Sequence, residues 1–264
     1  MASGYYVAMG GARAQEHRME TLSNDLANAQ TPGFKTQATI YQQIHNDVTR
    51  MGDPNQAMGL NHPVRFLPED RLPVVMTDRY TKFHQGSLRH TGNDLDVAIN
   101  GEGFFAVQGP NEVQYTRNGT FTLTKEGVLT DQDGSPVLAR SADGRFIGIK
   151  LPNAQGNIKI SREGQIFVGD EYVSELAITK FDDPHALERL GNSRWTNPDE
   201  NANPPLPDPN PDLHQGHLEL ANVNPIHTMA MLIKTNRVFE LNTRALQAYK
   251  AMDDSAIRDV GRPV

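Results

Sequence analysis

Residues 22–35 read Leu-Ser-Asn-Asp-Leu-Ala-Asn-Ala-Gln-Thr-Pro-Gly-Phe-Lys, a stretch that closes a helical pattern and then breaks it. The residue before a proline avoids the helical region, and glycine permits a positive φ, so Thr31-Pro32-Gly33 ends the helix. Phe34 follows the break as an apolar anchor. We therefore expect one helix over residues 4–30 that ends sharply before an anchoring aromatic side chain.

The expected helix carries apolar and small residues in steps that alternate between three and four. This spacing is a heptad seam, which is typical of a coiled coil. Gly4, Gly10 and Gly11 each weaken the helix by about 1 kcal/mol relative to alanine, so burial against a partner has to stabilise it. The seam consists of Tyr5, Ala8, Ala12, Gln15, Met19, Leu22 and Leu26.

A second block covers residues 86–121 and has the pattern of β structure. Residues 95–100 alternate larger apolar side chains with polar or small ones, which predicts one buried face and one open face. Gly101-Glu102-Gly103 predicts a turn before a strand that begins at Phe104. Asn118-Gly119 predicts a two-residue hairpin turn.

Residues 121–180 alternate short apolar runs with glycine-containing turns, which predicts an antiparallel, twisted or barrel-like β domain. Before this domain, the prolines of residues 45–80 predict an extended segment with one or two edge strands. The expected strands lie at 121–123, 128–130, 136–138, 146–149, 158–160, 165–168 and 176–178.

The last part of the chain begins with a proline-rich, acidic stretch over residues 197–212, which predicts a stiff extended linker. Residues 226–259 then predict a long helix with two apolar stripes. A single antiparallel pairing with the first helix would bury only one of them, so we expect packing against further chains. The stripes are Met229, Leu232, Phe239 and Leu246, and Val238, Leu241, Ala245, Ala248 and Met252.

Composition excludes several classes of protein. The net charge of −7 and the pI near 5.7 argue against a general nucleic-acid binder. The absence of cysteine excludes disulfides and thiolate metal sites. No apolar run approaches the ~20 residues of a membrane span, and residues 1–6 lack the start of a cleaved signal peptide. We therefore expect an acidic, soluble protein without membrane insertion.

Several local patterns are compatible with a catalytic or metal-binding site, but a purely structural role explains each of them better. Asp94 and Asp96 would face the same way on a strand, but no partner that raises a pKa is identifiable. His214 and His217 suit one helix face, but glycine lies between them and no further ligand is near. Residues 131–134 lack the later glutamate of a calcium loop and predict a β-turn. We expect no catalytic, cofactor or metal site.

Three blocks of the chain resemble the signatures of bacterial flagellar rod and hook proteins. Residues 24–35 fit Asn-x-Leu-Ala-Asn, two residues, Thr-x-Gly-Phe and a basic residue; residues 91–105 and 115–121 fit the middle signature. Residues 215–224 fit the third, with Ala221 in place of its serine. The signature residues are Asn24, Leu26, Ala27, Asn28, Thr31, Gly33, Phe34, Gly92, Leu95, Asp96, Gly101, Gly103, Phe104, Gln215, Gly216, Leu218, Glu219, Asn222, Val223 and Asn224.

The resemblance implies a structural subunit of the flagellar basal-body rod with an α+β fold. Long N- and C-terminal helices would pair as a coiled-coil layer, with a mainly antiparallel β domain between them. The implied partners are other rod proteins, copies of the same chain and the flagellar type III export apparatus. The implied location is the periplasmic rod, reached without a cleaved signal peptide. Residues 6–11 and 31–34 resemble the proximal rod type more than the distal type.

This interpretation divides the chain into an N-terminal helical assembly segment (1–35), an extended connection (36–85), a β domain (86–190), a linker (191–213) and a C-terminal helical assembly segment (214–264). Two other classes stay open: an enzyme that acts on cell-wall glycan through Asp94, Asp96 and Glu102, and a coiled-coil adaptor that never polymerises. The expected assembly interface comprises Tyr5, Ala8, Ala12, Met19, Leu22, Leu26, Phe34, Met229, Leu232, Phe239 and Leu246.

Overall fold

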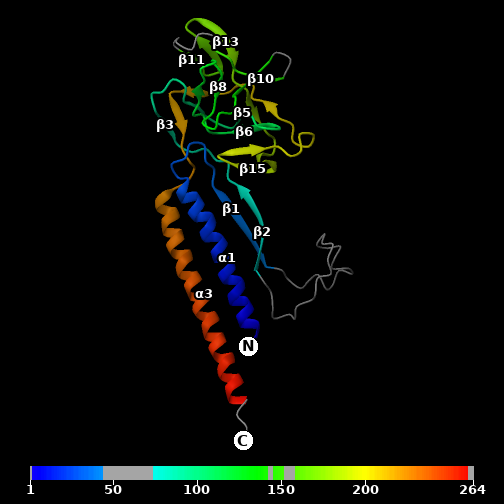
Figure 1. The fold of residues 1–264 in the computed structure, drawn as a ribbon, viewed down its shortest axis with the longest axis vertical. Helices are drawn as coiled ribbons and strands as arrows, with labels where there is room; N and C mark the ends of the chain where they lie inside the picture. The colour runs from blue at the N-terminus through cyan, green and yellow to red at the C-terminus, as the bar shows by residue number, and fades with distance from the viewer. Residues whose placement is uncertain (1, 44–73, 142–144, 152–157, 261–264) are drawn as a thin grey trace. The chain divides into compact units, whose positions relative to one another are not determined.

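The computed structural model describes residues 2–43, 74–141, 145–151 and 158–260 (Figure 1). In these residues the fold is α+β, with a long helix near each end of the chain and antiparallel strands between them. The chain divides into two compact units. Residues 1–26, 37–80 and 225–264 form the helical unit, and residues 27–36 and 81–224 form the β body.

The helical unit contains α1 (Ala2–Ala27) and α3 (Pro225–Val260), close to the bounds predicted from the sequence. The two helices lie side by side and run antiparallel (Figure 1). A Cβ atom on Gly4 would lie 2.5 Å from Tyr249 Oη, and one on Gly11 would lie 3.2 Å from Asn242 Nδ2. The two contacts are seven residues apart on each helix and follow opposite chain directions, as expected for an antiparallel pair. Glycine at both positions of α1 lets the helices approach closely.

The face that α1 turns toward α3 is therefore small, and larger apolar residues lie outside it. Ala12 is buried, whereas Tyr5 and Met229, two of the expected interface residues, are exposed. The remaining expected interface residues of the helices are half-buried: Ala8, Met19, Leu22, Leu26, Leu232, Phe239 and Leu246. None of the helices in the described part of the chain has the length and hydrophobicity that a bilayer crossing needs.

Residues 36–85, the expected connection, contain β1 (Gln37–Gln43) and β2 (Val74–Thr81), which form a two-stranded sheet. The structure describes residues 74–80 of the predicted extended segment, and the prediction for residues 45–73 lies outside the described residues.

The β body is built from short antiparallel strands, as the turn spacing predicted. Its largest sheet has six strands in the order β15-β16-β6-β5-β14-β17. β11 and β12 begin and end at the predicted residues. The strands are β3 (Leu88–His90), β4 (Val97–Ile99), β5 (Phe104–Gln108), β6 (Val113–Thr116), β7 (Thr122–Leu123), β8 (Leu129–Thr130), β9 (Leu138–Arg140), β10 (Phe146–Gly148), β11 (Ile158–Ile160), β12 (Gln165–Val168), β13 (Glu171–Glu175), β14 (Ile178–Lys180), β15 (Glu188–Gly191), β16 (Arg194–Thr196), β17 (Leu206–Pro207), β18 (Leu213–Gln215) and β19 (His217–Glu219).

Two buried clusters form the core of the β body. One gathers aliphatic residues around Phe105 and Phe121, and the other gathers aromatic residues around Tyr115 and Trp195. Both clusters lie within residues 97–213, so the apolar side chains of these strands are buried against one another within a single chain. The β body thus has a complete core of its own.

The prediction that β4 has one open face is wrong. Asp96 and Ala98 are buried together with Val97 and Ile99. The Asp96 carboxylate accepts hydrogen bonds from Thr91 Oγ1 at 2.7 Å and from Asn93 Nδ2 at 3.0 Å. These bonds satisfy the carboxylate inside the fold, so a polar side chain on this strand did not indicate exposure.

The predicted hairpin at Asn118-Gly119 is also wrong. β6 ends at Thr116 and pairs with β5 and β16, while Thr120 bridges to Asp96. Asn118 Oδ1 instead accepts a hydrogen bond from the Thr120 amide at 3.1 Å. The asparagine therefore shapes a crossing between strands rather than a two-residue turn.

The stretch expected as a linker, residues 191–213, contributes strands to the β body instead. β16 lies inside the six-stranded sheet and places Trp195 in the core. β17 pairs with β14 at the sheet edge, where Pro207 stands opposite Thr179. An edge strand tolerates proline because its outward N–H needs no partner, so a proline-rich composition did not exclude pairing.

Candidate functional site

The three signature blocks meet in the β body, although they are far apart in sequence. β18 pairs with β4, and β19 pairs with β3, so the third block lies against the second. The Gly216 amide donates to the Asp96 carbonyl at 2.8 Å, and the Gly216 carbonyl accepts from the Thr91 amide at 2.8 Å. Gln215 Nε2 donates to the Asp94 and Ile158 carbonyls, each at 2.8 Å.

The first block joins the other two at Gly33. Its amide donates to the Glu219 carbonyl at 2.8 Å, and its φ of 68° lies in the region that favours glycine. A Cβ atom at this position would lie 2.4 Å from the backbone nitrogen of Asn118. Glycine is therefore required here both by the conformation and by the close approach to the middle block.

Phe34 follows this contact and is only 1% exposed. The Arg189 guanidinium stacks over its ring at 4.5 Å, and Arg189 Nη1 donates to the Lys35 carbonyl at 3.4 Å. The anchoring role expected of Phe34 is thus fulfilled inside the β body. Because Phe34 is enclosed in this way, we propose that it anchors the chain within the β body rather than contacting neighbouring subunits.

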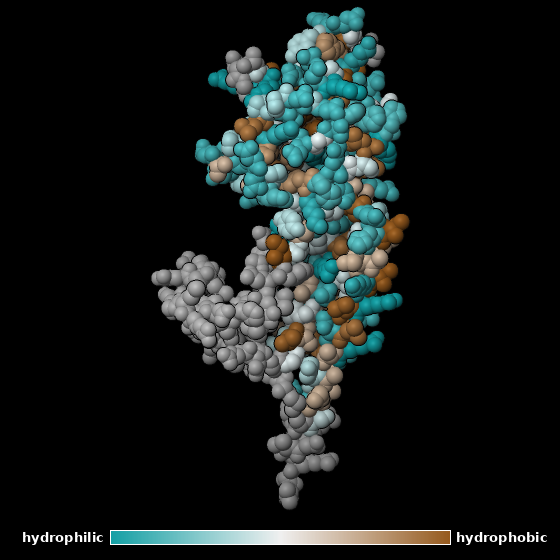
Figure 2. Space-filling model, turned by 180° about the vertical axis from the view of Figure 1, so that it is seen from behind, coloured by the Kyte–Doolittle hydropathy of each residue, from teal (hydrophilic) through white to brown (hydrophobic). Residues whose placement is uncertain are grey.

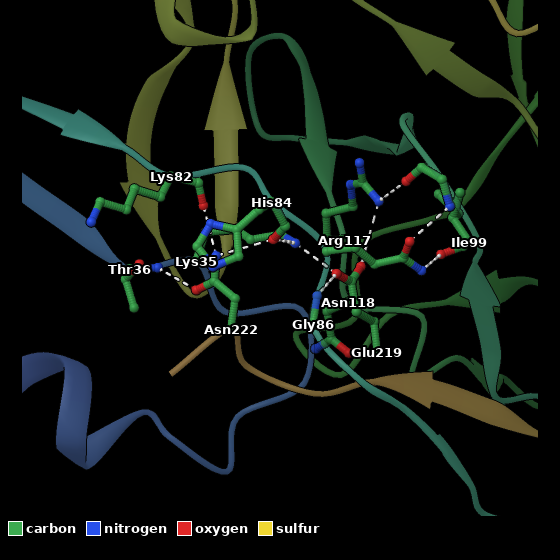
Figure 3. Close-up of polar contacts among 12 residues, drawn as sticks. Lys35, Thr36, Lys82, His84, Gly86, Ile99, Arg117, Asn118, Glu219 and Asn222 are labelled. Atoms are coloured by element: carbon green, nitrogen blue, oxygen red, sulfur yellow. Dashed lines mark hydrogen bonds and ion pairs between the residues drawn. The ribbon is translucent and has the colours of Figure 1, made fainter. Parts of the chain in front are cut away.

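Each signature block supplies one charged residue to a buried ion-pair cluster, which we call the latch (Figure 3). Lys35 Nζ lies 2.6 Å from Glu219 Oε1, and Arg117 Nη1 lies 3.5 Å from Glu219 Oε2. The side chains of Lys35 and Glu219 are fully buried, and that of Arg117 is 3% exposed. The Lys35–Glu219 pair joins residues 184 positions apart, and the Arg117–Glu219 pair joins residues 102 positions apart.

Two cations share one carboxylate in the latch, and burial makes this arrangement costly. Burial lowers the pKa of the Lys35 ammonium, partly offset by the Glu219 carboxylate, while Arg117 lowers it further. Burial also lowers the pKa of Arg117, with Glu219 and Glu102 acting in the opposite direction. The cluster therefore depends on Glu219, because removing it would leave two buried positive charges unpaired.

Backbone groups add hydrogen bonds to the latch. Lys35 Nζ donates to the His84 carbonyl at 2.9 Å, and Arg117 Nη1 donates to the Gly101 carbonyl at 2.8 Å. Glu219 Oε1 also accepts from the Gly86 amide at 2.8 Å. The latch thus fixes the segment before β3 and the turn before β5 as well as the three signature blocks.

The other signature residues lie on both sides of the latch in sequence. Asn28 Oδ1 accepts from Thr31 Oγ1 at 3.3 Å, which shapes the turn after α1. Gly101 and Gly103 have positive φ in the predicted turn before β5. Buried signature residues include Phe104 and Leu218. The signature residues that are exposed or half-buried are Asn24, Leu26, Ala27, Asn28, Thr31, Gly92, Leu95, Gly101, Gln215, Asn222, Val223 and Asn224.

The expected turn and the rejected catalytic pair can be compared with the structure. Residues 131–134 form the predicted turn, in which Asp131 Oδ1 accepts from the Asp133 and Ser135 amides, each at 3.0 Å. Asp94 is exposed in a turn whereas Asp96 is buried, so the two carboxylates do not share a face. Glu102 lies elsewhere, on a cavity of about 440 Å³ that also borders Arg117.

His214 and His217 lie on successive short strands rather than on a helix. Their rings are 5.8 Å apart, and His214 Nε2 lies 3.5 Å from Asp212 Oδ2. Among the residues that the structure describes, no three His, Cys, Asp or Glu side chains are grouped so that they could hold a metal ion.

The pairing of Lys35, Arg117 and Glu219 was not predicted from the sequence. Lys35, Arg117 and Glu219 each occur in the sequence as part of a motif, and none is distinguished there by its charge. The blocks also contain other charged residues, such as Asp25, Asp96 and Glu102, so no local signal marks the three that pair. Arg189 carried no motif signal at all, because its partner Phe34 lies 155 residues earlier.

Comparison with known proteins gives matches to three family models. Residues 6–35 match the flagella basal body rod protein model. Residues 98–168 match the flagellar hook protein FlgE/F/G D1 domain, and residues 214–259 match the flagellar basal body rod FlgEFG protein C-terminal model.

Curated relatives align along nearly the whole chain. The flagellar basal-body rod protein FlgF of Mesorhizobium japonicum is 30% identical over 262 residues, which are 99% of each chain. FlgF of Caulobacter vibrioides is 29% identical over 262 residues, again 99% of each chain. The flagellar basal-body rod protein FlgG of Buchnera aphidicola subsp. Schizaphis graminum is 28% identical over 263 residues, 96% of this chain and 97% of the relative.

Proposed function

Because the chain belongs to the family of flagellar basal-body rod proteins, we propose that it polymerises in the rod through the outward faces of α1 and α3. As a member of this family it is a structural subunit and not an enzyme. The proposal concerns how the subunit joins copies of itself and other rod proteins. Contacts that do not close on themselves would build a helical assembly.

The observation that carries the proposal is the exposure of large apolar side chains on a helix pair that already uses its inner face. Ile226 is 82% exposed and Leu241 is 62% exposed. Figure 2 shows hydrophobic side chains among hydrophilic ones on the helices. Exposed apolar surface of this kind marks an interaction site. The exposed residues are Tyr5, Tyr6, Val7, Met9, Ile226, Met229, Ile233, Leu241 and Met252.

The charges on the helices support contacts between unlike faces of neighbouring subunits. Residues 225–250 of α3 contain four basic residues and one acidic residue, whereas α1 contains three acidic and two basic residues. Residues 251–260 of α3 add three acidic residues and one basic residue, so the basic part of α3 is residues 225–250. This part in one subunit fits the acidic α1 of the next better than it fits the same part of another α3.

The test is a double substitution on the outer face, Ile233→Ser with Leu241→Ser, and Gln247→Ser is its matched control on the same helix. Both variants are expected to keep the helix content of the monomer, measured by circular dichroism. The double variant is expected to be lost from basal bodies isolated from cells that express it, while the control is retained. Incorporation of the double variant into basal bodies at the wild-type level would refute the proposed interface.

We further propose that the chain is the proximal rod subunit. The FlgF relatives support this assignment because they align with 99% of the chain, whereas the FlgG relatives align with 91–96%. Deleting a proximal subunit is expected to keep FlgG out of isolated rods. Finding a separate FlgF-type subunit retained in rods that lack this chain would instead favour the distal assignment.

The proposal includes periplasmic placement in the rod and passage through the flagellar type III apparatus without cleavage. Family membership supports both statements. Mass spectrometry of the subunit from basal bodies tests the second one, because an uncleaved chain retains a peptide that includes Tyr5 and Tyr6.

A further inference from the structure

The chain passes between the β body and the helical unit at four points, and at three of them the adjoining segments of the β body lie together around one side chain. Residues 34–36 precede β1, residues 82–84 follow β2, and residues 220–224 precede α3. We call these segments the exits. Asn222 lies among them (Figure 3).

The Asn222 side chain bonds the main chain of the other two exits. Its Oδ1 accepts from the Thr36 amide at 2.8 Å. Its Nδ2 donates to the Lys82 carbonyl at 2.8 Å and to the His84 carbonyl at 3.1 Å. The backbone amide of Asn222 adds a bond to the Phe34 carbonyl at 3.3 Å. The joined residues are 186, 140 and 138 positions from Asn222 in sequence.

This geometry needs an amide and excludes a carboxylate. One side-chain atom faces an N–H donor, and the other faces two carbonyl oxygens, so the second atom has to carry two hydrogens. Aspartate would place an oxygen, with a negative charge, against both carbonyls. Because Asn222 is only half-buried and belongs to neither core cluster, these bonds contribute little to the packing of the core.

We propose that Asn222 is a positioning residue that holds the three exits together, so that β1, β2 and α3 begin or end at fixed places on the β body. It acts on assembly through the helical unit, without contact with a neighbouring subunit. The inference rests on the proposed function, because exact placement of the exits matters only if the helices have to fit their neighbours.

The test compares Asn222→Asp with Asn118→Asp in the full-length protein. The control makes the same chemical change at Asn118, a half-buried asparagine of the β body. Its side-chain oxygen accepts hydrogen bonds from the Thr120 amide and hydroxyl, and aspartate keeps this acceptor. Amide hydrogen exchange at Thr36 directly reports the hydrogen bond that the Thr36 amide donates to Asn222 Oδ1. Fluorescence of Trp195, which is fully buried in the β body, reports global unfolding.

In Asn222→Asp, the carboxylate repels the Lys82 and His84 carbonyls and is expected to move away from the exits, so exchange at the Thr36 amide should rise about tenfold. The urea midpoint of Trp195 fluorescence is expected to match that of the control, and incorporation into basal bodies is expected to fall at least about fivefold. A merely structural role would lower the midpoint together with incorporation and would overturn the inference.

The outcomes separate this inference from the proposed function. If Asn222→Asp enters basal bodies as well as the control does, the positioning role is wrong and the rod function stands. If neither the wild-type chain nor the control enters basal bodies, the proposed function fails, and the inference fails with it.

Discussion

The two units of the chain bury their side chains in opposite ways. The β body encloses its large apolar residues, and Trp195, Phe105 and Ile166 have no exposed surface. In the helical unit, Gly4 and Gly11 of α1 pack against α3, while larger residues such as Ile226 face outward. The difference indicates that the β body is complete within one chain, whereas the helical unit has apolar surface left for other chains.

Charged residues follow the same division. The ion pairs of the latch, Lys35–Glu219 and Arg117–Glu219, lie within the β body. On the helices, basic residues such as Arg237 and Arg244 are exposed beside the outer apolar residues. The predictions below change one unit at a time, from the largest expected effect on stability to the smallest.

The largest effect is expected for Glu219→Gln. This change leaves Lys35 and Arg117 buried without a counter-charge, and breaking a buried pair costs about 3–5 kcal/mol. Urea unfolding followed by Trp195 fluorescence measures the loss. The exposed Glu126→Gln is the control and should stay within ~0.5 kcal/mol of wild type. Equal stability of the two variants would show that the latch is not needed for the β body.

A smaller loss is expected for Gly33→Ala, with Gly169→Ala as a matched control. Both glycines have a φ near 65°, but only a Cβ at position 33 would meet backbone, whereas position 169 is open. The control should lose about 1 kcal/mol from conformation alone, and Gly33→Ala about 2–4 kcal/mol. Equal losses in urea unfolding would contradict the close approach to Asn118.

Tyr115→Phe is expected to change how stability depends on pH. Burial first, then Glu200 and Glu112, raises the pKa of the Tyr115 phenol to about 12. Because the folded-state value exceeds the ordinary value of 10, this stability is present below pH 10 and is lost as pH rises toward 12. Its size is about 2 kcal/mol.

The variant should lack that alkaline loss. At pH 8 it should be more stable by about 1–2 kcal/mol, since the buried Tyr115 hydroxyl has no hydrogen-bond partner among the residues that the structure describes. Unfolding free energies at pH 8 and pH 11 test both points. Lys35, whose pKa is lowered by burial, is present in both proteins, so the difference between their pH curves isolates Tyr115. Parallel pH curves would contradict the assignment.

The smallest effect on stability is expected for Ile226→Ser on the outer face of α3. Ile226 is 82% exposed, so the free energy of unfolding should change by less than ~0.5 kcal/mol. Ala12→Leu on the buried inner face should cost about 1–3 kcal/mol by overpacking the helix pair. Thermal unfolding followed by circular dichroism compares the stabilities of the two variants. A larger loss for Ile226→Ser than for Ala12→Leu would contradict the assignment of the outer and inner faces.

Local patterns predicted the parts of the fold that local physics determines. Heptad spacing and a proline-glycine break predicted α1, and glycine-marked turns predicted β11 and β12. The pairing of Lys35 with Glu219 escaped prediction because its partners are 184 residues apart and neither charge signals burial by itself. Asp96 was misassigned to an open face for the same reason, since its burial depends on bonds from Thr91 and Asn93.

Composition misled the interpretation of residues 191–213. Proline and acidic residues favoured a linker, yet β16 and β17 belong to the six-stranded sheet. What the sequence could not reveal was that Trp195 lies opposite Tyr115 and that Pro207 occupies a sheet edge. Both facts depend on which strands become neighbours, a tertiary property that a local pattern does not encode.

The most direct test of the central claim is hydrogen exchange on the purified monomer, repeated on isolated basal bodies. The claim is that the β body is complete in one chain, whereas the helices are completed by neighbouring subunits. We expect strands such as β5 and β6 to be protected equally in both samples, and α1 and α3 to gain strong protection only in basal bodies. Full protection of both helices in the monomer, unchanged on assembly, would contradict the claim.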